Sequence, residues 1–345
     1  MGVNEWLAAW AVRRAHVLVV EVPGWWTSRV AVERAVTARG WRTALSPADA
    51  DVLVVCGVPG PRLAAAVDRV WDQLPGPRAR TAVTGTDATG ALDEVAARLQ
   101  DDRRQRADAR DRPDRTARPD DEPDDEMAPA GIPLAGGADD RDGLEMDVLQ
   151  VPLGPVLPHW PAGLVLHCAL HGDVVAGART EVLDAGPLPR PPRAGTAASR
   201  TVAARCDGAA RLLALAGWDA AADDARHARD LLLDDAAGAG AALGAVRARV
   251  RRSRVLRRQL SGLGPLDEGA LRTHGLPPAA GGDVRDRLLV MLDPARGTAV
   301  PPDPGAVLAA LPVLVRGLEL GAARLVVAGL APDTAAAVHR ERAHA

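Results

Sequence analysis

The chain contains no phenylalanine, tyrosine or lysine, so all 42 of its basic residues are arginines. Its core must therefore depend on alanine, valine and leucine, with eight tryptophans as the large anchoring side chains. The net charge of −3 and the 47% hydrophobic content are typical of a globular protein and exclude a disordered or collagen-like chain. A length of 345 residues gives room for two ordinary domains.

Cysteine is also scarce. Cys56, Cys168 and Cys206 lie far apart and form neither a metal-ligand motif nor a disulfide framework, which predicts a reducing compartment. No apolar run is long enough for a membrane helix, because the best candidate, residues 307–320, is interrupted by a proline, an arginine and a glutamate. The first 14 residues lack the order of a secretory signal. These absences predict a cytoplasmic protein without a membrane span.

Residues 1–100 alternate between strand and helix patterns. Short apolar runs rich in β-branched residues indicate buried parallel strands, and the segments between them place their apolar residues on one helical face. This alternation predicts a parallel, doubly wound α/β sheet of the flavodoxin-like type. The predicted strands are 16–20, 51–56 and 80–84, and the predicted helices are 28–39, 61–74 and 91–99.

The rest of the chain divides into two further regions. Residues 101–143 are dominated by Asp, Arg and Pro, which predicts a disordered linker because such a segment buries too little apolar surface. Residues 144–345 predict an α+β domain with a small β region and a helical bundle. Its predicted elements are a hairpin of strands 164–170 and 174–182 and helices 202–216, 219–234, 241–260 and 307–330.

Two stretches of the first region resemble a known family. Residues 50–57 (ADVLVVCG) and 69–78 (RVWDQLPGPR) are similar to the small iron–sulfur subunit of complex I, the respiratory NADH:quinone oxidoreductase, and of the related membrane-bound nickel–iron hydrogenases. In that family the same strand, loop, helix and proline-terminated end occur in this order. The resemblance covers roughly ninety residues of the chain and implies a common ancestry for this region.

The ligand positions of that family are changed. The family binds a tetranuclear iron–sulfur cluster through a cysteine pair after the first strand and a Gly-Ser-Cys turn after the third. Here the first position has Trp25 and Trp26, the second has Thr86 and Asp87, and Cys56 lies within a strand. Such a cluster needs about four thiolates. The resemblance therefore implies a degenerate cluster site, and the sequence predicts no bound cofactor.

The region after the linker is similar to the large, quinone-site subunit of the same enzymes. Residues 154–164 (GPVLPHWPAGL) correspond to a family loop that begins Gly-Pro-Gln-His-Pro, and residues 171–175, 260–266 and 267–286 follow the same pattern further on. Leu157 replaces the quinone-facing histidine of that loop, and Pro161 replaces a second histidine. The paired Cys-x-x-Cys motifs of the hydrogenases are absent. The sequence thus predicts neither the family's quinone site nor a nickel–iron centre.

Together the two resemblances predict a fusion of two degenerate subunits. The expected role is a redox-inactive structural or assembly subunit of a complex I-like or hydrogenase-like assembly, peripheral on the cytoplasmic membrane face and not catalytic by itself. Its expected partners are other subunits of that assembly, not nucleic acid. One alternative is an active NADH- or quinone-linked oxidoreductase subunit with a variant site. A small-molecule or regulatory binding module is a third possibility.

Trp25 and Trp26 are the most prominent of the replaced positions. Two indoles bury a large apolar area, so we expect them to fill the space that a cluster would occupy. His159, His167, Cys168 and His171 are the only group that resembles a metal site. In a strand, however, residues 167 and 171 are about 13 Å apart, too far to share a zinc ion. We therefore expect these histidines to be structural or exposed.

Three other patterns point to ligands or partners. Residues 84–90 (TGTDATG) form a strand-to-helix turn, which favours anions, but they lack the Lys-Ser/Thr of a phosphate loop. Residues 238–244 resemble a dinucleotide fingerprint but follow a helix, so we discount them. A stripe formed by Arg247, Arg251, Arg254 and Arg258 is compatible with nucleic acid. It is more typical of a contact with an acidic protein or with the linker.

Overall fold

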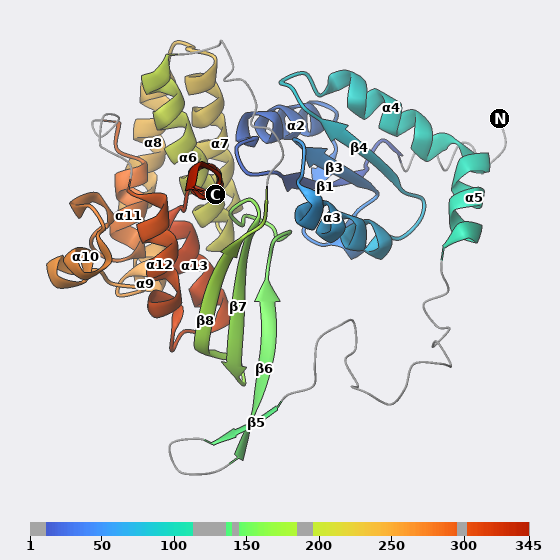
Figure 1. The fold of residues 1–345 in the computed structure, drawn as a ribbon. Helices are drawn as coiled ribbons and strands as arrows, with labels where there is room; N and C mark the ends of the chain where they lie inside the picture. Colours follow the sequence, from blue (N-terminus) through green and yellow to red (C-terminus); the bar gives the residue numbers. More distant parts are fainter. Residues whose placement is uncertain (1–11, 113–135, 140–144, 185–195, 295–301, 345) are drawn as a thin grey trace.

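The computed structural model describes residues 12–112, 136–139, 145–184, 196–294 and 302–344, and it begins with a parallel sheet (Figure 1). The strand order is β2-β1-β3-β4, with β1 His16–Glu21, β2 Arg42–Thr43, β3 Val52–Cys56 and β4 Ala79–Val83. β3 is buried along its whole length, as expected for a central strand between two helical layers. The three predicted strands are confirmed. β2 escaped prediction because it has only two residues, both exposed.

Helices cover both faces of this sheet. α3 (Pro61–Gln73) packs on one face together with the side chains of Leu18, Val20 and Leu53. α2 (Trp26–Ala38) and α4 (Thr89–Gln100) pack on the other face, against Val17 and Val54. The alternating apolar residues of the strands supply these two separate contact surfaces. The first region is therefore an α/β unit, and its three predicted helices are confirmed.

The first part of the predicted disordered linker is helical, so the predicted start of the linker at residue 101 is wrong. Residues 102–111 form helix α5 (Asp102–Asp111), whose first turn is capped by the Asp101 side chain. Gln105 accepts a hydrogen bond from the Arg78 backbone N–H at 2.9 Å, and Arg78 also donates to the Asp108 carboxylate. These contacts hold a helix of very polar composition that has no buried residue of its own. Residues 113–135 and 140–144 of the predicted linker lie outside the described residues.

An antiparallel sheet follows, in the order β5-β6-β7-β8. The predicted hairpin is confirmed as β7 (Leu164–His171) and β8 (Val174–Val182), joined by a turn in which Gly172 has φ 62°. β6 (Glu145–Leu153) pairs with β7, and β5 (Gly136–Asp139) pairs with β6. β5 falls within the predicted linker, which is a second correction to that boundary. The short strand pairs through its backbone, so its glycine-rich sequence gave no side-chain signal.

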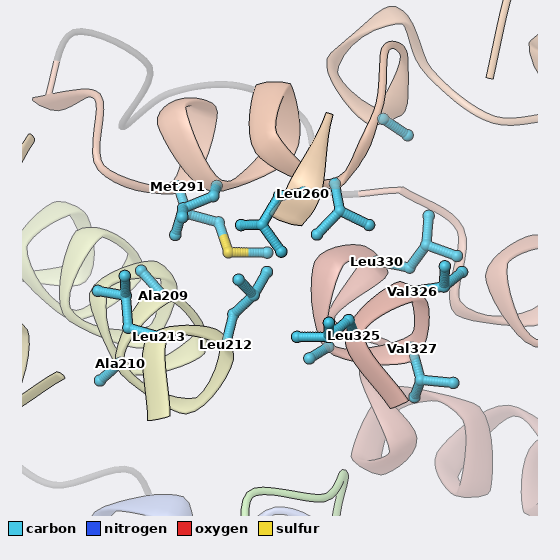
Figure 2. Close-up of a cluster of buried hydrophobic side chains, with 14 of the residues drawn as sticks. Ala209, Ala210, Leu212, Leu213, Leu260, Met291, Leu325, Val326, Val327 and Leu330 are labelled. Carbon is cyan, nitrogen blue, oxygen red and sulfur yellow. The ribbon is translucent and has the colours of Figure 1, made fainter. Parts of the chain in front are cut away.

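The remaining helices pack on one side of this sheet around a common apolar core (Figures 1 and 2). The core draws Leu212, Leu260, Met291 and Val326 from four different helices. These helices are α6 (Ala197–Leu215), α7 (Asp219–Leu233), α8 (Ala239–Arg252), α9 (Arg254–Leu260), α10 (Glu268–His274), α11 (Val284–Met291), α12 (Pro304–Val315) and α13 (Leu320–Leu330). The last helix, α14 (Thr334–His344), instead places Val338 in a second cluster with the parallel sheet. Two predicted long helices are each divided in the structure, at Ser253 and at residues 316–319.

The two regions share part of one core. Trp25 of the first region lies in the same buried cluster as Val165, Leu183 and Val338 of the second. A backbone hydrogen bond from Gly60 N–H to the Asp184 carbonyl, at 3.2 Å, joins them at another point. Among the described residues no single helix is long and apolar enough to cross a membrane, and α13 and α14 reach that length only as a pair bent by 71°.

Candidate functional site

Trp25 lies at the carboxyl end of the parallel sheet, where the resemblance places a metal cluster. Its backbone N–H donates to the Val22 carbonyl at 3.0 Å, and its indole packs over Gly57, the residue after β3. Gly57 has φ +110°, and a Cβ atom there would stand 2.4 Å from the Trp25 Cγ atom. Trp25 is only 6% exposed. The indole therefore fills the space directly above the ends of β1 and β3.

The side chains present at this position do not suit an iron–sulfur cluster. The cluster needs about four thiolates, and the nearest cysteine is Cys56, whose side chain is fully buried in β3. Burial raises the pKa of the Cys56 thiol well above its ordinary value, so the thiolate form is strongly disfavoured. The other side chains beside Trp25 are mainly hydroxyls and small aliphatic groups, with two carboxylates and one guanidinium. These side chains do not provide the ligands of such a cluster.

A buried ion-pair network joins the two regions beside Trp25. It consists of Glu21, Arg29 and Glu33 from β1 and α2, and Asp207, Arg211 and Arg229 from α6 and α7. Figure 1 shows α2 lying between the parallel sheet and α6 and α7. Each of these arginines makes one ion pair across the junction, so the centre of the network holds three guanidiniums and three carboxylates. Arg229 also pairs with Asp230 at the edge of the network.

The crossing ion pairs are short. Arg29 Nη2 donates to Asp207 Oδ2 at 2.6 Å, over a separation of 178 residues in the sequence. Arg211 Nη2 donates to Glu21 Oε2 at 2.5 Å, and Arg229 Nη1 donates to Glu33 Oε2 at 2.8 Å. Such charge-assisted hydrogen bonds fix the relative orientation of the elements that carry them. The three pairs thereby lock the end of β1 and α2 against α6 and α7.

Burial and the neighbouring arginines shift the pKa values of these carboxylates in opposite directions. Burial by itself would raise the pKa of Asp207, but Arg29, Arg211 and Arg229 outweigh it and hold that pKa far below its ordinary value. The pKa of Glu33 is lowered in the same way, because Arg29 and Arg229 outweigh its burial. Arg229 is only 2% exposed, and its pKa is raised because Asp207 and Glu33 offset its desolvation. Asp207, Glu33 and Arg229 therefore stay ionised at neutral pH.

A cleft of about 170 Å³ opens next to the network, and we call it the inner cleft. It brings the β1–α2 turn, the loop between β6 and β7, α6, and the α13–α14 junction to one place. Its lining residues are Glu21, Gly24, Trp26, His159, Pro161, Ala162, Ala204, Asp207, Gly208, Arg211, Ala328, Ala331, Pro332, Asp333, Thr334 and Ala335. Most of these side chains are apolar, and the charged ones belong to the network or to the start of α14.

His159 is the titratable side chain that distinguishes this cleft. It has φ 58°, and Arg324 Nη2 fixes its position by donating to the neighbouring Pro158 carbonyl at 2.9 Å. Burial, helped by the nearby Arg226 and Arg211, lowers the pKa of His159 to about 4. The imidazole is consequently neutral at pH 7. A neutral imidazole can accept or donate a hydrogen bond to an uncharged ligand.

A second, larger cleft of about 790 Å³ runs along α2, and we call it the α2 groove. Its walls are one face of α2, the turn between β4 and α4, and the end of α7. Its lining residues are Trp25, Thr27, Ser28, Val30, Ala31, Arg34, Ala35, Ala38, Thr84, Gly85, Thr86, Asp87, Ala88, Thr89, Leu233 and Asp234. The strand-to-helix turn expected over residues 84–90 lies where the sequence placed it, between β4 and α4.

The residues predicted to mark degenerate sites lie in three places. Trp26 and Pro161 line the inner cleft together, although one belongs to the cluster-like motif and the other to the quinone-loop-like motif. Trp25, Thr86 and Asp87 line the α2 groove. Leu157 lies in neither cleft and packs against the core of the helical region. The two motifs therefore adjoin in space, which neither motif shows by itself.

The buried ion-pair network is the feature that sequence reasoning missed. Its members are separated by up to 208 positions (Glu21 to Arg229), and isolated charged residues on amphipathic helices are ordinarily read as solvated. One signal was available: Arg29 and Glu33 lie four positions apart on the face of α2 that also carries Val32 and Val36. An apolar stripe on a helix is expected to be buried, and charged side chains next to it are then buried as well. Because a buried charge is costly unless it is paired, such residues indicate an oppositely charged partner.

The group of histidines and cysteine suspected as a metal site is dispersed. His167 hydrogen-bonds Glu181 at 2.8 Å across the β7–β8 hairpin. Cys168 is buried in the core with its Sγ directed to the Leu166 carbonyl, and His159 lies in the inner cleft. In the part of the chain that the structure describes, no three His, Cys, Asp or Glu side chains are placed to hold a metal ion. The absence of a cofactor remains a prediction.

The predicted arginine stripe is divided by the break at Ser253. Arg247 pairs with Asp293 at 3.2 Å, and Arg249 pairs with Asp224 and lies over the Trp218 ring. The further arginines of α8 and α9 are exposed around Val255, which is itself 77% exposed. The stripe is thus a surface feature well apart from both clefts. A comparison with known protein families finds none that matches the chain, and a search among curated proteins finds no match either.

Proposed function

We propose that the protein is a redox-inactive structural or assembly subunit of a complex I-like or hydrogenase-like assembly. In this proposal its first region is a flavodoxin-like counterpart of the small subunit, and its second region is a counterpart of the large subunit. The observation that carries the proposal is the buried ion-pair network, which binds the two regions tightly at the place where the cluster-like and quinone-loop-like motifs meet.

The residues found at the two motifs, Trp25 and Leu157, support a structural role. Trp25 fills the position above the strand ends with an apolar ring, and Leu157 faces a hydrophobic core. Both substitutions favour packing over polar chemistry, because each places apolar surface away from water. The contact between the regions is preserved by charged groups that are costly to bury unless each is paired. A protein selected for its shape and its contacts is expected to have this combination.

The proposal is tested by isolation of the tagged full chain from its own host under anaerobic conditions in mild detergent. Recovery with membrane subunits and with cluster-bearing partners supports a non-catalytic subunit. The same tag on an unrelated cytoplasmic protein of that host controls for adventitious recovery. Recovery of a colourless chain without partners would contradict the proposal.

The inner cleft favours a second candidate, an oxidoreductase subunit with a variant site. His159 is neutral at pH 7 and lines a largely apolar cleft together with the aromatic Trp26 and the cationic Arg211. Such a cleft suits a small, uncharged planar group such as the ring of a quinone. The test is NADH- or hydrogen-linked quinone reduction by the anaerobically purified protein. Activity that is lost in His159→Asn and kept in His171→Asn would establish this function.

A further inference from the structure

The α2 groove has the composition of a ligand site that the proposed function does not use. It extends from the carboxyl edge of the parallel sheet along α2, and its volume of about 790 Å³ falls within the range of roughly 300–1,000 Å³ that is typical of small-molecule sites. One end is rich in hydroxyl groups. The other end is formed by the small apolar side chains of Ala31, Ala35 and Ala38, with Leu233 opposite them.

Two helices begin at the hydroxyl-rich end. α2 has 13 residues and α4 has 12, and their first turns contribute Thr27, Ser28, Ala88 and Thr89 to the groove. Neither helix has an acidic residue in its first turn, and among the described residues no side chain caps the start of α2. At α4 the Asp87 side chain, which precedes the helix, accepts a hydrogen bond from Thr89 N–H, and the next N–H groups of that turn have no side-chain acceptor in the described part of the chain. The free N–H groups of such turns carry partial positive charge and bind anions. The groove thus receives the positive ends of two helix dipoles.

Buried polar groups without partners lie at the same end. Ser28 is only 2% exposed, forms part of the groove wall, and has no hydrogen-bond partner within the described ranges. Trp25 is 6% exposed, and its Nε1 likewise has no partner in the described part of the chain. Buried polar side chains nearly always have a partner. Two unpartnered groups in one wall indicate a ligand that supplies acceptors.

The charged side chains of the groove are already engaged by the protein. Asp87 accepts a hydrogen bond from Thr89 N–H at 3.0 Å. Asp234 accepts one from Arg34 Nη1, also at 3.0 Å. The groups that remain for a ligand are therefore hydroxyls, the indole N–H and backbone N–H groups, which are chiefly donors. Donors of this kind suit the oxygens of a phosphate, and the alanine face suits a less polar body attached to it.

We propose that the α2 groove binds an organic phosphate, with the phosphate group at the first turns of α2 and α4 and the organic body along the alanine face of α2. The ligand is a phosphomonoester of small-molecule size. This site is independent of the inner cleft and of any role in an oligomeric assembly. The assignment concerns binding and requires no reaction at the groove.

The test uses the full-length ¹⁵N-labelled chain and follows backbone amide signals during titration. Inorganic phosphate at millimolar concentrations should shift the amides of Trp26, Thr27, Ser28, Ala88 and Thr89, whereas matched sodium chloride should not. Of AMP, FMN and glycerol 3-phosphate, at least one should bind about tenfold more tightly than inorganic phosphate, because its body adds contacts. Adenosine, riboflavin and glycerol, which lack the phosphate, should leave these amides unshifted.

Three variants sharpen the result. Ser28→Ala removes a donor to a charged group and should weaken binding about tenfold or more, with no loss of thermal stability because the hydroxyl has no partner in the protein. Thr37→Ala removes a hydroxyl from α2 outside the groove and should change nothing. Asp87→Asn removes a repelling charge and should tighten binding about two- to fivefold.

Other outcomes would overturn the assignment. If inorganic phosphate leaves the five amides unshifted, or if Ser28→Ala binds as tightly as the native chain, the groove is not a phosphate site. If inorganic phosphate binds but none of the three esters binds more tightly, the ligand is a free anion and the organic part of the proposal is wrong.

Discussion

Trp25 shows how one large side chain fills the space above the ends of two strands. Its ring is in contact with Gly57, whose positive φ and missing side chain make room for it. Trp26, the next residue, is only half-buried and faces the inner cleft. The two adjacent tryptophans therefore have different roles, although in the sequence they form one pair. Only Trp25 fills the space above the strand ends.

This difference predicts unequal effects of truncation. Trp25→Ala should lower the free energy of unfolding by about 3–5 kcal/mol, because it leaves a large cavity in a shared core. Trp26→Ala should lower it by about 1 kcal/mol. Urea denaturation followed by circular dichroism measures both. Equal losses for the two variants would show that Trp25 does not fill a tightly packed space.

His159 predicts a pH dependence of stability. Its pKa is about 4 in the folded chain against an ordinary value of 6.5, so the unfolded chain binds more protons between these values. Stability should therefore fall as the pH decreases from 6.5 to 4, by at most about 3 kcal/mol. His159→Asn should remove this loss, since asparagine tolerates the positive φ of this position.

The control for this prediction is His171→Asn in the β7–β8 hairpin. Unfolding free energies measured between pH 4 and 7 should give the same slope for this variant as for the native chain. An unchanged slope in His159→Asn would mean that another group causes the pH dependence.

At the scale of elements, the network holds α2 against α6 and α7. Asp207 accepts hydrogen bonds from three arginines, and a carboxamide at this position would leave their charges poorly compensated. Asp207→Asn should lower the free energy of unfolding by about 3–5 kcal/mol. The same substitution at Asp93, which forms an exposed pair with Arg39 and is 68% exposed, should cost less than about 1 kcal/mol. A small effect at Asp207 would mean that the arginines find other partners.

Element boundaries show what sequence patterns can and cannot predict. The strands and helices of the first region follow from apolar runs and helical faces, and the hairpin follows from a glycine in its turn. The long helix expected over 241–260 is divided because the Ser253 side chain accepts a hydrogen bond from Leu256 N–H and starts a new helix. α5 was missed because its stability comes from Arg78, more than twenty positions away in the sequence. Contacts of that range leave no periodic signal.

The candidate sites show the same limit. Trp26 and Pro161 are singled out in the sequence only by their two separate motifs, and their common cleft depends on the packing of two regions. The pairing of Arg29 with Asp207 spans 178 positions and was not foreseen at all. The turn at Thr84 was placed correctly, because a strand and a helix flank it directly in the sequence. Local features were predictable, and those that require the assembled fold were not.

At the scale of the whole molecule, the two regions behave as one body with a common core. Trp25, Val165, Leu183 and Val338 are buried in the same cluster, and the network lies beside them. A specific protease site introduced between residues 113 and 135 should therefore give two fragments that remain associated after cleavage. Size-exclusion chromatography should show them eluting together at the position of the intact chain.

A matched variant makes this prediction specific. The cleaved chain that carries Asp207→Asn should separate into its fragments at lower denaturant concentration than the cleaved native chain. Fragments of the native sequence that separate in buffer alone would show that the covalent connection, and not the interface, holds the regions together.

The crossing pairs Arg29–Asp207, Arg211–Glu21 and Arg229–Glu33 also constrain how the protein can change over generations. A mutation that alters one of these charges leaves its counterpart stranded away from water, so tolerated changes must arrive on both sides of the junction. A single reading frame passes both sides on together. If two separate genes encoded the two regions, recombination could combine variants from different lineages. The charges on the two sides of the junction would then no longer pair.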